Sequence, residues 1–155
     1  MKARKILIIT SIVLAVLGLI LWLTLPALVY VNSVNGKVTS TISGVATIFG
    51  GDVVSKSGLS SKIFKASPML IITFTLVIAG IALSIIRLIG KKNMVLMVIT
   101  LSCFALATIF VILTKQFIVP VSGNKSVVKN FTLMGPIFAY ALFFASTITS
   151  IIKGK

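Results

Sequence analysis

The chain has 155 residues, of which 58% are hydrophobic, and its mean hydropathy is +1.22. Fifteen lysines and arginines stand against a single acidic residue, Asp52, which gives a net charge of +14. A soluble domain of this size could not hide so much apolar surface, so the composition indicates one integral membrane domain over residues 1–155.

The basic residues lie mainly at the ends of apolar runs, where their side chains can reach the phosphate headgroups. This pattern predicts anchoring to anionic lipid headgroups and no nucleic-acid partner. Recognition of an anionic polymer or an acidic protein is the alternative use of the charge.

Four apolar stretches are each about 20 residues long, the length that crosses roughly 30 Å of hydrocarbon. The first is too long for the apolar region of a signal peptide, and no small-residue cleavage site follows it, so we expect it to be retained. The predicted spans cover residues 6–25, 68–89, 94–114 and 132–152.

The expected ends of these spans carry helix signals. Ser67 and Asn93 are candidate N-caps, and Pro68 occupies the favoured first helical position. Arg87, near the end of the second span, is expected to extend toward the headgroups. Pro136 is expected to delay or kink the start of the fourth span.

Basic residues are dense in very short segments on one side of the predicted spans and sparse in two longer loops, 26–67 and 115–131. By the positive-inside rule, both termini are expected in the cytoplasm of an integral cell-membrane protein. The cytoplasmic residues are then Lys2, Arg4, Lys5, Arg87, Lys91, Lys92, Lys153 and Lys155. Those on the other side are Lys37, Lys56, Lys62, Lys65, Lys115, Lys125 and Lys129.

The first long loop opens with a segment that alternates polar and apolar residues around Asn35-Gly36. Such a pair favours a β-hairpin with a two-residue type I′ turn. The predicted cross-strand pairs are Val34 with Lys37, Asn32 with Thr39 and Tyr30 with Thr41.

A lone hairpin is marginally stable, so further strands are expected. Residues 46–49, 52–55, 116–121 and 126–131 are the candidates. The segment 56–65 is interpreted either as a short interfacial helix or as a flexible serine-rich linker. The expected fold is an all-α membrane protein, a four-transmembrane-helix bundle with a small extracytoplasmic antiparallel β-sheet built from both loops.

This order of a helix, a long β-rich loop, two helices joined by a tight turn, and a shorter loop before the last helix resembles the claudin-like tetraspan proteins. The resemblance is one of architecture and covers the whole chain. The Gly-Leu-Trp triplet and cysteine pair of that family's first loop are absent, and the only tryptophan, Trp22, lies in the first span. The resemblance implies adhesion, sealing or partner organisation.

Residues for catalysis or metal binding are scarce. Histidine and glutamate are absent, and Asp52 has no second carboxylate beside it in sequence. General acid–base work and metal ligation both need such groups, so we expect no enzyme, cofactor or metal. Cys103 is interpreted as a packing residue. Because serines and lysines share the outer loops, a Ser–Lys dyad is the remaining catalytic alternative.

Asp52 follows Phe49-Gly50-Gly51. One interpretation is a tight turn with glycines at positive φ and the carboxylate accepting backbone hydrogen bonds. The other is an internal salt bridge or a contact with a partner.

Small residues recur at helical spacing in three spans, where they allow close approach of helices in lipid. The predicted packing residues are Ser11, Ala15, Gly18, Gly80, Ser84, Ala141 and Ala145. Strongly polar residues are missing from the span interiors, which argues against a selective channel or proton-coupled transporter.

These observations favour a non-enzymatic protein whose extracytoplasmic part contacts a protein partner or another copy at the cell surface. The alternatives are a small homo-oligomeric, holin-like pore and an immunity-type protein against a membrane-active toxin. The candidate interaction surface comprises Tyr30, Asn32, Lys37, Thr39, Thr41, Asp52 and Lys125.

Overall fold

A computed structural model describes residues 2–31, 38–54, 60–90, 93–117, 119–120 and 134–151. Its helices are α1 (Lys2–Thr24), α2 (Gly44–Phe49), α3 (Pro68–Ile89), α4 (Met94–Ile112), α5 (Thr114–Phe117) and α6 (Met134–Ile151). Its strands are β1 (Pro26–Val31), β2 (Val38–Ser43), β3 (Gly51–Val54), β4 (Ser60–Lys65) and β5 (Val119–Pro120).

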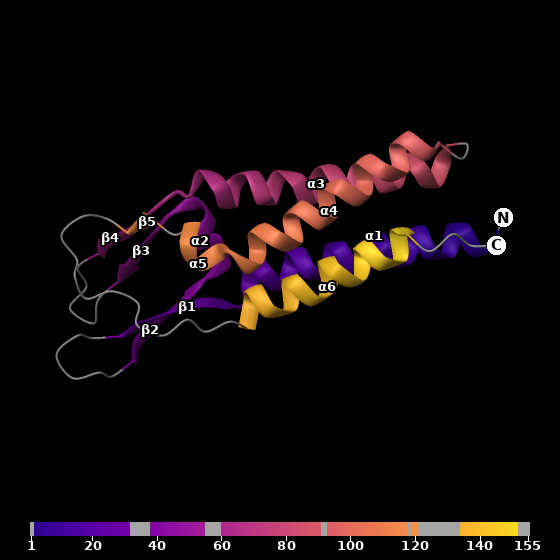
Figure 1. Cartoon of the computed structure of the whole chain (residues 1–155). Helices are drawn as coiled ribbons and strands as arrows, with labels where there is room; N and C mark the ends of the chain where they lie inside the picture. The colour runs from indigo at the N-terminus through magenta and orange to yellow at the C-terminus, as the bar shows by residue number, and fades with distance from the viewer. Residues whose placement is uncertain are drawn as a thin grey trace.

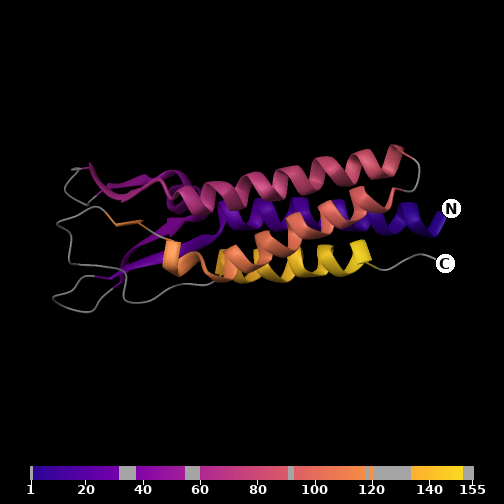
Figure 2. The same cartoon turned by 45° about the horizontal axis from the view of Figure 1, so that its top comes forward.

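Helices α1, α3, α4 and α6 run alongside one another in an elongated bundle (Figures 1 and 2). Within the described ranges, three helical segments are long and apolar enough to cross a membrane: Arg4–Thr24, Pro68–Ile89 and Met94–Ile112. This confirms that the chain contains long apolar helices that could cross a membrane. The apolar part of α6, Ile137–Thr149, is shorter than these three.

The predicted helix starts are confirmed for α3 and α4. The Ser67 side chain accepts a hydrogen bond from the backbone N–H of Leu70, and Pro68 is the first helical residue. The Asn93 side chain accepts from the N–H groups of Val95 and Leu96. Each cap satisfies amides that the helix itself leaves unpaired. Pro136 falls in the first turn of α6, where its missing N–H costs no helical hydrogen bond.

The strands gather at one end of the bundle, together with α2 and α5, and we call this the strand end (Figure 1). Strands β1 and β2 form one antiparallel pair, and β3, β4 and β5 form a second antiparallel sheet in that order. The pairing of β4 with β5 joins the two long loops of the sequence. The loops therefore meet as expected, but in two sheets and not in one.

The hairpin is present with a register that differs from the prediction. Tyr30 lies opposite Ser40, and Thr41 lies opposite Val29, one residue away from the predicted pairing. Among the described residues, the pair nearest the turn, Val31 with Val38, is already two residues away from the predicted alignment, and irregularities follow between Tyr30 and Val31 and between Pro26 and Leu28. The other two predicted pairs involve residues 32, 34 and 37, which lie outside the described residues.

Other segments of the two loops also depart from the prediction. Residues 46–49, predicted as a strand, belong to helix α2, whereas 52–54 form most of β3 as expected. The segment from Ser60 to Lys65 is strand β4, neither helix nor linker, because it pairs on both sides. In the second loop, the predicted strand 116–121 is divided between α5 and β5. The predicted strand 126–131 lies outside the described residues.

Candidate interaction surfaces

The predicted interaction residues are spread over both sheets. Tyr30 lies in β1, Thr39 and Thr41 lie in β2, and Asp52 lies in β3, opposite Lys62 of β4. Asn32, Lys37 and Lys125 lie outside the described residues. The first three therefore lie on paired strands, but Tyr30 is opposite Ser40 and not opposite Thr41 as predicted, while Asp52 belongs to the sheet that joins the two loops.

The turn predicted around Asp52 lies at Gly50, two residues earlier in the chain. Gly50 follows α2 with φ 84° and ψ 154°, a conformation accessible almost only to glycine. Gly51 already begins β3, and a Cβ added there would lie 2.7 Å from the Cβ of Ala46. The tight-turn interpretation is thus right for Gly50, whereas Asp52 itself is a strand residue.

Ser67 connects three elements of the strand end. Its backbone N–H donates to the carbonyl of Ile48 in α2 at 3.0 Å, and its hydroxyl donates to the carbonyl of Phe117 in α5 at 2.5 Å. The same hydroxyl caps α3. Sequence reasoning identified the cap but not the two links, since their partners are 19 and 50 positions away along the chain. Segments from both loops are thereby fastened to the start of α3.

Helix α2 is seated directly on the last turns of α1. Gly44 is buried, and a Cβ at this position would lie 1.8 Å from the carbonyl oxygen of Trp22. Thr47 and Ile48 are also buried, and the Thr47 hydroxyl donates to the carbonyl of Gly44 at 2.7 Å. The absence of a side chain at Gly44 is what permits this close approach.

Aromatic pairs add to the contacts between the strand end and the bundle. Phe49 of α2 meets Phe74 of α3 edge to face, with ring centroids 5.5 Å apart. Phe117 of α5 meets Phe110 of α4 in the same way at 6.0 Å. Such pairs add roughly 0.5–1.5 kcal/mol beyond the burial of their area.

The small residues predicted on α1 lie against α6. Ser11 and Ala15 are buried, and the hydroxyls of Ser11 and Ser146 lie 2.8 Å apart. The Ser146 hydroxyl also lies 2.9 Å from the Ser11 carbonyl and can donate to it. A Cβ at Gly18 would come within 2.9 Å of the Phe143 ring, so this ring fills the space that the glycine leaves. The two helices are joined by close packing and by hydrogen bonds.

A similar contact joins α3 and α4. A Cβ at Gly80 would lie 2.7 Å from the ring of Phe104, which is fully buried. Ser84 is buried and donates to the carbonyl of Gly80 at 2.8 Å. The two residues thus present a small surface to the neighbouring helix, and the Ser84 hydroxyl has its hydrogen bond within its own helix.

The small residues predicted on α6 do not form its packing face. Ala141 is exposed and Ala145 is half-buried, whereas Ala139, Phe143 and Ser146 are buried. The spacing of two alanines is compatible with either face of a helix. The face that packs is decided by the large Phe143 ring, which has a matching space on α1 at Gly18.

The interior of the bundle is filled with large side chains. Trp22, Phe104 and Phe143 are fully buried, and the rings of Trp22 and Phe143 meet edge to face at 6.4 Å. The buried Nε1–H of Trp22 has no acceptor within the described part of the chain.

Among the described residues, no three His, Cys, Asp or Glu side chains lie together as metal ligands would. Cys103 is half-buried on α4.

At the opposite end, which we call the arginine end, Arg4 of α1 and Arg87 of α3 come together. The Nη2 of Arg4 donates to the carbonyl oxygen of Arg87 at 3.2 Å. Arg87 is only 8% exposed in this arrangement, and its extension toward the headgroups stays a prediction. The contact with α1 covers it, and nothing in the local sequence of α3 signals that contact.

Comparison with known proteins places no family on this arrangement: no protein-family model, curated protein or solved structure matches the chain.

Proposed function

We propose that the chain is a four-span cell-membrane protein, with α6 as the fourth span, the strand end outside the cell and the arginine end in the cytoplasm. The 18 residues of α6 have a helical length of about 27 Å, close to the roughly 30 Å of a hydrocarbon core. Helix α6 also contacts α1 along a buried line through Phe143 and Ser146. Both termini then lie on the side with the denser basic residues.

The outer faces of the helices suit lipid. Exposed apolar side chains run along α1, α3 and α4, including Ile9, Val13, Ile78, Val98 and Ile109. Exposed apolar area on this scale is stable only in a hydrocarbon environment or beneath a partner. The threonine hydroxyls in the described spans bond to their own helix, as Thr73 does to the carbonyl of Met69, and Ser11 and Ser146 bond each other between helices. They therefore present little unsatisfied polarity to lipid.

We propose further that the strand end binds a protein partner or another copy of the chain, and that the protein has no catalytic role. The observation that carries this proposal is that two contacts join the two loops: the hydrogen bond from Ser67 to Phe117 and the pairing of β4 with β5. Ordering a backbone costs roughly 1–2 kcal/mol per residue. A preorganised surface reduces the ordering that remains when a partner binds.

The filled interior favours this proposal over a pore. Trp22, Phe104 and Phe143 occupy the space between the helices, so a conducting path would have to run between copies and not through one. The resemblance in architecture to claudin-like proteins agrees with this proposal, since it implies adhesion or partner organisation.

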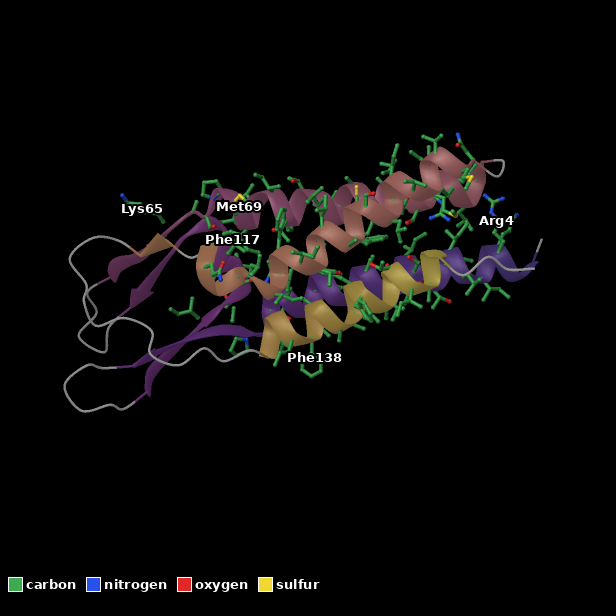
Figure 3. The ribbon with its side chains drawn as sticks, viewed as in Figure 1. Arg4, Lys65, Met69, Phe117 and Phe138 are labelled. Carbon is green, nitrogen blue, oxygen red and sulfur yellow. The ribbon has the colours of Figure 1, made fainter. Side chains whose placement is uncertain are left out.

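The charge of the loops sets the chemistry of the partner. Loops 26–67 and 115–131 contain Asp52 as their only acid and several lysines, including the exposed Lys65 (Figure 3). We therefore expect an acidic partner surface and binding that weakens as salt rises.

The test is the composition and mass of the particle solubilised gently from its own membrane after crosslinking. A discrete heteromer, or a discrete homodimer crosslinked through the strand end, would support the proposal. Lys65→Glu should reduce the amount of partner recovered in the crosslinked particle. Lys5→Glu reverses an exposed charge at the arginine end; it is the matched control and should leave that amount unchanged. A large homo-oligomeric ring that makes cells leak would contradict the proposal and support a pore.

A further inference from the structure

The arginine end concentrates positive charge in a partly enclosed place. Arg4 lies in the first turn of α1, and Arg87 lies in the last turn of α3. The Arg4 side chain reaches the end of α3 and donates a 3.2 Å hydrogen bond from Nη2 to the Arg87 carbonyl. Figure 3 shows Arg4 at the end of the bundle far from Lys65 and the strands.

As a whole residue Arg87 is nearly buried, yet no protein group in the described ranges accepts a hydrogen bond from its guanidinium. It is 8% exposed, and the hydrogen bond that involves this residue and Arg4 uses the Arg87 carbonyl, not its side chain. A guanidinium has five N–H donors that need acceptors. The guanidinium nitrogens of Arg87 are not among the buried, unpartnered atoms of the described residues, so they keep access to the surroundings and can donate to a group from outside the protein.

No acidic side chain of this protein can supply that acceptor. Asp52 is the only one in the sequence, and it lies in β3 at the strand end. The start of α1 adds a positive partial charge beside Arg4, and its first turn contains no acid. The carbonyls at the end of α3 offset only part of the two full charges. Within the described residues no acidic group lies beside the two arginines, so an anionic group of another molecule can supply the counter-charge.

We propose that Arg4 and Arg87 form a binding site for the phosphate group of an anionic phospholipid headgroup. Phosphate oxygens match the planar fork of a guanidinium, which can bind them through two parallel hydrogen bonds. Basic sites between transmembrane helices at the cytoplasmic surface are suited to such headgroups. Lys5, by contrast, is exposed and does not belong to a partly enclosed site.

This site rests on the proposed membrane placement, which puts the helix ends at headgroup level. It is independent of whether the strand end binds a partner. Free inorganic phosphate offers the same chemistry, but it lacks the acyl chains that would lie along the exposed apolar faces of α1 and α3. The lipid source is therefore the one to which we commit.

The test is lipid binding to the full-length protein purified in mild detergent, measured by native mass spectrometry and by the shift in thermal unfolding on adding lipid. Phosphatidylglycerol, phosphatidylcholine and inorganic phosphate are the three probes. We expect the wild type to retain phosphatidylglycerol in preference to phosphatidylcholine and to be stabilised by it. Inorganic phosphate alone should have little effect at the same concentration.

Substitution then locates the site. Arg87→Gln should weaken phosphatidylglycerol binding by about tenfold or more, since a charge-assisted contact is lost. Arg4→Gln, at a half-buried position, provides a second variant if the first does not fold. Lys5→Gln and Lys65→Gln are matched controls that remove an exposed charge beside the site and one at the far end, and they should bind as the wild type does.

Three results would overturn the lipid site: no headgroup preference in the wild type, equal stabilisation by inorganic phosphate alone, or equal loss of binding in the lysine controls. Any of these, found in a protein that inserts into membranes, leaves the proposed function of the strand end standing. Failure to insert would overturn both.

Discussion

The seat of α2 on α1 can be tested by replacing Gly44 with alanine. The new Cβ would lie 1.8 Å from the carbonyl oxygen of Trp22, about 1.5 Å closer than an ordinary carbon–oxygen contact of roughly 3.3 Å. The obstacle is backbone in the last turns of a helix, so it cannot rotate aside as a side chain can. Helix α2 must therefore move away from α1.

The expected cost follows from three contributions. Overpacking costs roughly 1–3 kcal/mol, and a backbone obstacle favours the upper value. The better helix propensity of alanine returns about 0.5–1 kcal/mol. Movement of α2 also loosens Ile48, which is fully buried, and complete exposure of such a side chain costs about 1.5–3 kcal/mol. We expect the free energy of unfolding to fall by about 2–4 kcal/mol.

Trp22 makes the assay specific, because it is the only tryptophan and it lies at this contact. In mild detergent, Gly44→Ala should unfold earlier in a denaturant titration, and its native fluorescence should shift toward longer wavelength. Val45→Ala, at a neighbouring position that is 45% exposed, should change stability by less than about 0.5 kcal/mol. Wild-type stability and an unshifted spectrum in Gly44→Ala would refute the reasoning.

Further substitutions to alanine test the helix contacts. Removing Ser11 or Ser146 by alanine should each cost about 0.6–1.7 kcal/mol, and a double-mutant cycle should show coupling between them; strict additivity would contradict the hydrogen bond. Ser67→Ala removes a cap and a link to α5, so the unfolding free energy should fall by about 1–2 kcal/mol. Phe143→Ala should cost about 3–5 kcal/mol in the same titration, whereas Phe138→Ala, at a side chain 49% exposed, should cost much less; equal losses would argue against the Gly18 contact.

The bundle helices were the part of the fold most open to prediction from sequence. Long uncharged runs have few structural alternatives, and local signals such as Ser67-Pro68 and Asn93 mark their starts through hydrogen bonds within three residues. The start of α3 was predicted to the residue.

The strand end was less predictable because distant contacts decide it. Residues 46–49 have strand-like composition. Two distant contacts stabilise them as a helix instead: the packing of Gly44 against the Trp22 carbonyl and the hydrogen bond from Ser67 to Ile48. Strand β4 is stabilised by pairing with β3 on one side and β5 on the other. The residues of β5 lie more than 50 positions away from β4 along the chain. A bulge in the hairpin is likewise invisible to an alternation count.

The candidate surfaces show the same limit. Spacing identified the small residues of α1 and α3, but it could not decide which face of α6 would pack, since that depends on Phe143 meeting Gly18. The meeting of Arg4 with Arg87, 83 residues apart, follows from the tertiary fold alone.

The central claim, four spans with the strand end outside, is tested most directly by cysteine accessibility. Cys103 is the only cysteine, so Cys103→Ala gives a background in which Lys5, Lys65 or Lys153 is replaced singly by cysteine. With a membrane-impermeant maleimide on intact cells, we predict labelling of Lys65→Cys alone, and labelling of the other two only after lysis. Labelling of Lys153→Cys from outside, with Lys5→Cys protected, would mean three spans and would contradict the account.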